Sequence, residues 1–131
     1  MIKKILLIVS LCASVFAAQI EWAPSYKVAV EKAKKENKLI LLMLTQPGCP
    51  ACSDMKKIMS GDDLIVNEIN TKFVPVEVNV YEGQWNQKFR AIATPTFYFL
   101  DSNENKTTKF LSGGTSGSVF FKILKDAQQK R

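Results

Sequence analysis

The chain has 131 residues, of which 47% are hydrophobic and 23% charged, and its 18 basic and 12 acidic residues give a formal net charge of +6. This length suits one domain and is too short for two, and the composition is that of a folded globular protein. The basic residues are scattered and form no long block, which argues against a nucleic-acid-binding surface. The sequence has no histidine, so Cys–His nucleophilic pairs, histidine general bases and most zinc sites are excluded.

Residues 1–17 have the three-part pattern of a secretory signal peptide. A short basic start is followed by an apolar stretch, which ends at the small residue Ala17. The stretch is too short for a comfortable membrane span. We therefore expect cleavage after Ala17 or one residue later, export to the periplasm, and a mature domain over residues 18–131. An uncleaved membrane anchor and lipidation at Cys12 are the alternatives.

The first part of the mature chain predicts a helix, a buried strand and a second helix. Residues 23–37 have helical periodicity, with one apolar and one charged face. Residues 39–44 form a continuous apolar run closed by turn residues, which is typical of a central strand covered on both faces. Cys49-Pro50-Ala51-Cys52 follows at once. Pro50 suits the first position of a helix, because it has no N–H to leave unpaired there.

The remaining elements complete an α/β pattern. A helix start at residues 62–63 precedes a valine-rich strand over residues 73–80, and the following segments are a loop with a short helix (83–91), a strand (96–100), a strand (106–111) and a helix (116–129). Because helices join the first two strands, these should be parallel. The last two strands should form an antiparallel hairpin. The prediction is a four-stranded mixed sheet flanked by helices.

The two motif cysteines are placed for redox chemistry. Cys49 would lie at a helix start, where unpaired N–H groups and the positive end of the helix dipole stabilise a thiolate. Cys52, one turn later, is near enough to close a disulfide. Cys49 can then attack a substrate disulfide, and Cys52 can resolve the mixed disulfide. The alternatives are a structural disulfide, which would stabilise little across so short a loop, and half of a metal site, for which further ligands are missing. We expect no metal and no cofactor.

At this point the residues resemble a known family. Gln46-Pro47-Gly48-Cys49-Pro50-Ala51-Cys52 after an apolar strand is similar to thioredoxin-like proteins of the bacterial periplasm, with the SoxW-like branch and the C-terminal domain of DsbD as the nearest likeness. The resemblance continues through Met55 and the segments 62–63, 73–79 and 93–96, and covers residues 24–129. It implies a thioredoxin-like fold with one nucleophilic and one resolving cysteine.

The resemblance also implies roles for particular residues. Cys49 would be the nucleophile and Cys52 the resolving thiol. The peptide bond before Pro95 would be cis, with Thr94 beside the substrate, so that Pro50, Thr94 and Pro95 are the expected substrate-binding residues. The expected partners are protein disulfide substrates and a membrane thiol donor of the DsbD type.

Three positions depart from the thioredoxin pattern. Gly48 stands where thioredoxins usually carry tryptophan, and Met43 stands where thioredoxin has a buried aspartate. Glu77 takes the place of thioredoxin's lysine. Two interpretations of Glu77 remain open. It is an ordinary solvent-facing glutamate, or it lies under the motif and accepts the proton of Cys52 when that thiol must attack.

The most favoured function is that of a periplasmic thiol–disulfide oxidoreductase that reduces protein disulfides. Pro50 and Ala51 offer no side-chain donor to overstabilise a thiolate, which weakly favours a reductase over a strong oxidant. The alternatives are an oxidase that introduces disulfides and a non-enzymatic thioredoxin-fold binding module. An isomerase usually needs a dimerisation region, for which this chain has no room, so an isomerase is disfavoured. We expect a monomer.

Overall fold

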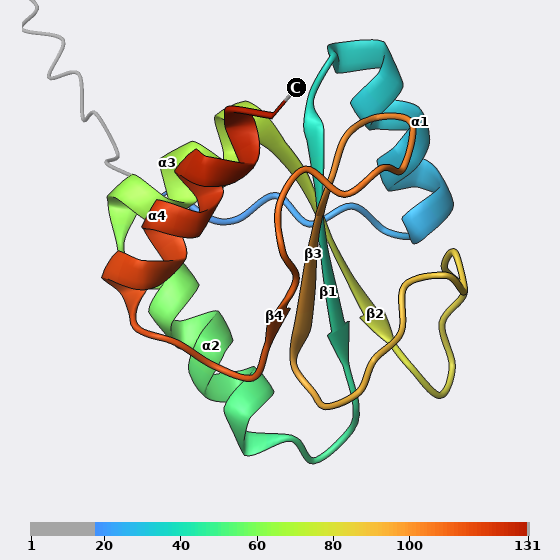
Figure 1. Ribbon diagram of the computed structural model, residues 1–131. Coiled ribbons are helices and arrows are strands. Elements are labelled where there is room, and N and C mark those ends of the chain that lie inside the picture. The colour runs from blue at the N-terminus through green and yellow to red at the C-terminus, as the bar shows by residue number, and fades with distance from the viewer. Residues whose placement is uncertain (1–17, 131) are drawn as a thin grey trace, which may run out of the picture.

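A computed structural model of the protein describes residues 18–130 (Figure 1). The signal peptide expected over residues 1–17 lies outside this range. In chain order the elements are α1 (Tyr26–Glu36), β1 (Leu39–Thr45), α2 (Pro50–Ser60), α3 (Asp63–Lys72), β2 (Phe73–Asn79), β3 (Thr96–Leu100), β4 (Leu111–Ser112) and α4 (Gly117–Gln128). Within the described part of the chain, no helix combines the length and the apolar character needed to cross a bilayer.

The strands form one mixed sheet in the order β2-β1-β3-β4. β1 and β2 are parallel, whereas β3 is antiparallel to both β1 and β4. Helices α2, α3 and α4 cover one face of the sheet and α1 covers the other (Figure 1). This arrangement confirms the predicted four-stranded mixed sheet flanked by helices.

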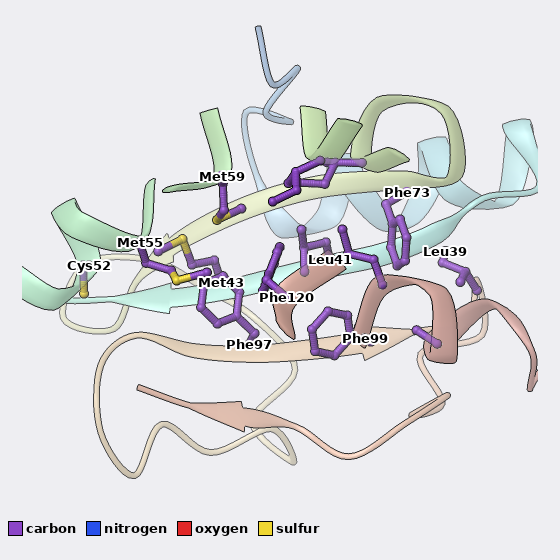
Figure 2. Close-up of a cluster of buried hydrophobic side chains, with 14 residues drawn as sticks. Leu39, Leu41, Met43, Cys52, Met55, Met59, Phe73, Phe97, Phe99 and Phe120 are labelled. Atoms are coloured by element: carbon purple, nitrogen blue, oxygen red, sulfur yellow. The ribbon is translucent and has the colours of Figure 1, made fainter. Parts of the chain in front are cut away.

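The continuous apolar run of β1 follows from this two-sided cover. Successive side chains of a strand point to opposite faces, and both faces of β1 are fully buried. The face toward α2, α3 and α4 receives Leu39, Leu41 and Met43. The face toward α1 receives Ile40, Leu42 and Leu44. Figure 2 shows the first of these clusters, with Cys52 and Met55 at the end where α2 begins.

The strand predicted over residues 106–111 was largely wrong. Only one isolated bridge, between Leu100 and Lys106, forms there, and β4 begins at Leu111, opposite Phe97. The backbone N–H of Thr107 donates to the Phe99 carbonyl over 2.9 Å and the Thr107 hydroxyl donates to it over 3.3 Å. The chain therefore satisfies its polar groups close to β3 without forming a regular ladder.

The short helix predicted within residues 83–91 was also wrong. Asn86 accepts the N–H of Lys88 on its side-chain oxygen, and the Trp85 indole donates to the Phe89 carbonyl over 2.8 Å. Side chains that bond to nearby backbone groups compete with the helical ladder. The segment is instead an irregular loop that leads to β3.

Candidate active site

The motif loop joins the end of β1 to the start of α2. Gly48 has a φ of 66°, in the left-handed region that favours glycine, and a side chain at this position would meet open space. Cys49 caps α2, and Pro50 occupies its first turn, as predicted. The loop thus turns the chain sharply and presents Cys49 at the N-terminus of the helix.

Cys49 and Cys52 form a disulfide across Cα atoms that are 5.3 Å apart. Cys49 is partly exposed, whereas Cys52 is only 4% exposed and belongs to the core cluster with Met55 (Figure 2). The backbone N–H of Cys52 donates to the sulfur of Cys49 over 3.1 Å. The sulfur of Cys49 is therefore the one that a substrate can reach, and it accepts a hydrogen bond from a helix N–H group.

Thr94, in the loop before β3, contacts the sulfur of Cys49. Its hydroxyl donates to Cys49 Sγ over 3.4 Å, and its carbonyl oxygen lies 3.5 Å from the same atom. The Thr94–Pro95 peptide bond is cis. Pro95 is buried, and its carbonyl accepts the N–H of Gly113 over 2.7 Å. The structure thus brings together Cys49, Pro50, Thr94 and Pro95 from the predicted set.

Glu77 lies on β2, opposite Met43 of β1. Its carboxylate accepts hydrogen bonds from the Lys56 ammonium on both oxygens, each at 3.1 Å, and from the Thr45 hydroxyl at 3.1 Å. The side chain is 30% exposed. Glu77 is therefore partly exposed and ion-paired with Lys56, and its role as a proton acceptor stays a prediction.

Glu77 and Lys56 line a polar cavity of about 600 Å³ next to the motif loop. The other lining residues are Trp22, Ala23, Thr45, Gln46, Pro47 and Asn79. Sequence reasoning missed Lys56. The available signal was its position four residues after Cys52, which places both residues on the same face of α2.

The surroundings of the motif suit electron transfer between disulfides. Among residues 18–130, no group of three or more potential ligands from His, Cys, Asp and Glu could hold a metal ion. The chemistry available at the site is thiol–disulfide exchange at the Cys49–Cys52 pair.

The chain is similar to known proteins across nearly the whole described domain. The thioredoxin-like domain family matches residues 26–128. No curated protein matches the chain. Among the solved structures that share its fold, DsbH oxidoreductase is 18% identical, with 94% of each chain covered and a TM-score of 0.70. A putative disulphide-isomerase from Bacteroides thetaiotaomicron is 22% identical, with 88% of this chain and 98% of that chain covered and a TM-score of 0.74. A thioredoxin from Thermus thermophilus is 22% identical, with 84% of this chain and 88% of that chain covered and a TM-score of 0.69.

At such low identities these three structures establish the fold alone, while the match to the family covers most of the chain. The predicted thioredoxin-like α/β fold is thereby confirmed. The redox pair at the start of α2 supplies the chemistry. The chain therefore belongs to the thioredoxin-like domain family and is a thiol–disulfide oxidoreductase with a Cys49–Cys52 disulfide at the start of α2.

Proposed function

We propose that the chain is an exported reductase of protein disulfides. The observation that carries this proposal is the asymmetry of the redox pair, with an accessible Cys49 sulfur beside Thr94 and an enclosed Cys52 behind it. The Cys49 thiolate attacks one sulfur of a substrate disulfide, and the other substrate sulfur leaves as a thiolate. Cys52 then attacks Cys49 and releases the second substrate thiolate. The substrate gains two electrons, and the enzyme is left with the Cys49–Cys52 disulfide.

The donors around the motif support the reductive direction. The sulfur of Cys49 receives one backbone N–H, from Cys52, and one hydroxyl, from Thr94. The motif residues Pro50 and Ala51 contribute no side-chain donor. Strong oxidants owe their high potential to an overstabilised reduced form. A site with few donors therefore favours a reductase.

Export and electron supply complete the proposal. The signal-like segment over residues 1–17 would direct the protein to the periplasm. There, the disulfide left after each turnover must be reduced again, and a membrane thiol donor of the DsbD type would supply the two electrons. Thr94, Pro95 and Pro50 would contact the substrate, and the enzyme would act as a monomer.

Glu77 is proposed to accept the proton that Cys52 loses when it attacks. The support is local. Its strand neighbour Met43 packs in the same cluster as Cys52, and its ion-pair partner Lys56 lies one turn after Cys52 on α2. The polar cavity beside the motif loop contains no histidine to take this role.

The reduction potential of the Cys49–Cys52 pair tests the proposal most directly. It is measured by equilibrating residues 18–131 with defined thiol–disulfide buffers and quantifying the reduced form. A reduction potential of about −270 mV, as in thioredoxin, supports a reductase, whereas a potential of about −120 mV would make the protein an oxidase. Failure to exchange with any disulfide would instead favour a binding module.

Export is tested separately on protein from its native envelope. We expect mass spectrometry of the soluble envelope fraction to find an N-terminus at residue 18 or 19. Protein that retains Met1 and remains in the cytoplasm would contradict export.

A further inference from the structure

The two most exposed large hydrophobic side chains of the described chain lie on loops beside the redox motif. Ile92 is 77% exposed and Tyr81 is 75% exposed. Tyr81 follows the end of β2, and Ile92 lies in the loop before β3. The ends of the parallel strands β1 and β2 and the beginning of the antiparallel strand β3 meet at the same edge of the sheet, where the motif loop also lies (Figure 1). Isolated exposed apolar residues are common, but these two lie on loops at the end of the sheet where α2 begins with Cys49 as its cap.

Tyr81 is fixed in its exposed position by a tight turn. Its N–H donates to the side-chain oxygen of Asn79 over 2.9 Å, and the Asn79 carbonyl accepts the N–H of Gly83 over 2.7 Å. A side chain at Gly83 would collide with Val78 and Asn79, so the turn requires glycine here. The Tyr81 hydroxyl donates to the side chain of Gln46 over 3.3 Å. The ring of Tyr81 is therefore anchored to the motif loop at Gln46, which stands three residues before Cys49.

Ile92 is held between two anchored carbonyls. The hydroxyl of Tyr98 donates to the Arg90 carbonyl over 2.6 Å, and the hydroxyl of Thr96 donates to the Ala93 carbonyl. Two residues after Ile92, Thr94 contacts the sulfur of Cys49. The exposed isoleucine thus lies on the loop that also places Thr94 against the sulfur of Cys49.

We propose that Tyr81 and Ile92 are substrate-specificity residues, which bind apolar side chains on either side of the cysteine in an extended polypeptide. The inference rests on the proposed reductase function. A small disulfide has no such side chains, and a tightly folded protein buries most of them. The preferred substrate class is therefore an unfolded or partly folded polypeptide, in which a disulfide is flanked by apolar residues.

The test uses the pre-reduced protein, residues 18–131, in single-turnover reactions with three disulfides. Two are disulfide-linked peptides whose cysteine is flanked by Phe and Leu or by Ser and Gly, and the third is 2-hydroxyethyl disulfide. We expect the wild type to prefer the apolar peptide. Tyr81→Ser and Ile92→Ser should each raise the half-saturation concentration for that peptide about tenfold, since burying such a side chain contributes at least that factor. The maximal rate and the rate with 2-hydroxyethyl disulfide should not change.

Two variants serve as controls. Tyr81→Phe removes the bond to Gln46 but keeps the ring, and should retain most of the preference. Leu64→Ser removes a side chain that is 69% exposed at the start of α3, which is separated from Cys49 by the whole of α2, about 16 Å long. It should behave as the wild type.

The outcomes separate the two proposals. Equal use of both peptides by the wild type, an unchanged preference in Tyr81→Ser and Ile92→Ser, or a parallel loss with 2-hydroxyethyl disulfide would overturn the specificity role while leaving the reductase intact. A wild-type protein that reduces none of the three disulfides would overturn the proposed function itself.

Discussion

The two sulfur atoms of the redox pair lie in different surroundings. Cys49 is partly exposed and receives the Cys52 N–H and the Thr94 hydroxyl, whereas Cys52 is packed in the core beside Met55. A thiol that is accessible and hydrogen-bonded at a helix start reacts faster than an enclosed one. Their positions therefore favour Cys49 as the nucleophile and Cys52 as the resolving thiol, as proposed.

This asymmetry predicts different outcomes for the two serine variants. Cys49→Ser should abolish disulfide reduction, because no accessible sulfur remains. Cys52→Ser should accumulate mixed disulfides between Cys49 and its substrates, because the second displacement is lost. Mass spectrometry of the trapped species under non-reducing conditions checks the second outcome. Equal alkylation rates of the two thiols in the reduced wild type would contradict the assignment.

A second prediction at the residue scale concerns Glu77. Glu77→Gln keeps an oxygen that can accept from Thr45 and Lys56 but removes the proton-accepting carboxylate. We expect the formation of the mixed disulfide by Cys49 to stay within about twofold of the wild type, while its release slows by about tenfold or more, the usual scale of general-base assistance. Rapid-quench measurements resolve the two steps. Lys56→Gln is the matched control for loss of the ion pair without loss of the carboxylate. Wild-type rates for both steps in Glu77→Gln would exclude the role.

At the scale of single elements, the helices follow local sequence signals closely. Asp62 caps α3 by accepting the N–H groups of Leu64 and Ile65 at 2.9 and 3.4 Å. We expect Asp62→Ala to lower the free energy of unfolding by about 1 kcal/mol, because two backbone donors lose their partner. Asp62→Asn, which keeps a capping oxygen, should remain close to the wild type. Denaturant titrations of the oxidised protein measure both, and equal losses in the two variants would contradict a capping role.

The sequence was informative where a local pattern determines the structure and less so where distant residues do. The apolar run of β1, the cysteine motif and the cap of α2 were all predictable. The loop over residues 83–91 was not, because its conformation depends partly on Asn86 donating to Glu104, eighteen residues away. The ion-pair partner of Glu77 could not be predicted either. Lys56 lies on α2, and its ammonium contacts the Glu77 carboxylate only when β2 is paired with β1.

At the scale of the whole molecule, two carboxylates tie distant elements together. Glu104, in the turn after β3, accepts the hydroxyl of Tyr26 on α1 over 2.5 Å, and this hydrogen bond lowers the pKa of Glu104. Glu68 on α3 pairs with Lys125 on α4 and accepts a hydrogen bond from Gln128 over 2.6 Å. Burial acts to raise the pKa of Glu68, but the bonds from Gln128 and Lys125 outweigh it, so its pKa lies below the ordinary value.

These two pKa shifts predict how stability depends on pH. A carboxylate whose pKa is lower in the folded than in the unfolded state contributes its full stability above the unfolded value, about 4.3 for glutamate. As the pH falls through that value toward the folded pKa, the unfolded state binds protons first, and the contribution is lost. The free energy of unfolding should therefore decrease between about pH 5 and pH 3.

Glutamine variants assign this decrease to the two groups. Glu104→Gln and Glu68→Gln should each lower the free energy of unfolding by about 1 kcal/mol at pH 7, the scale of one intramolecular hydrogen bond. Each should cost less at pH 3, where the wild-type contribution has already been lost. Glu82→Gln, at an exposed position in the turn after β2, is the surface control. Urea titrations at pH 7, 5, 4 and 3 measure all four proteins. A loss in either variant that is equally large at pH 3 and pH 7 would mean that the side chain acts through packing and not through its charge.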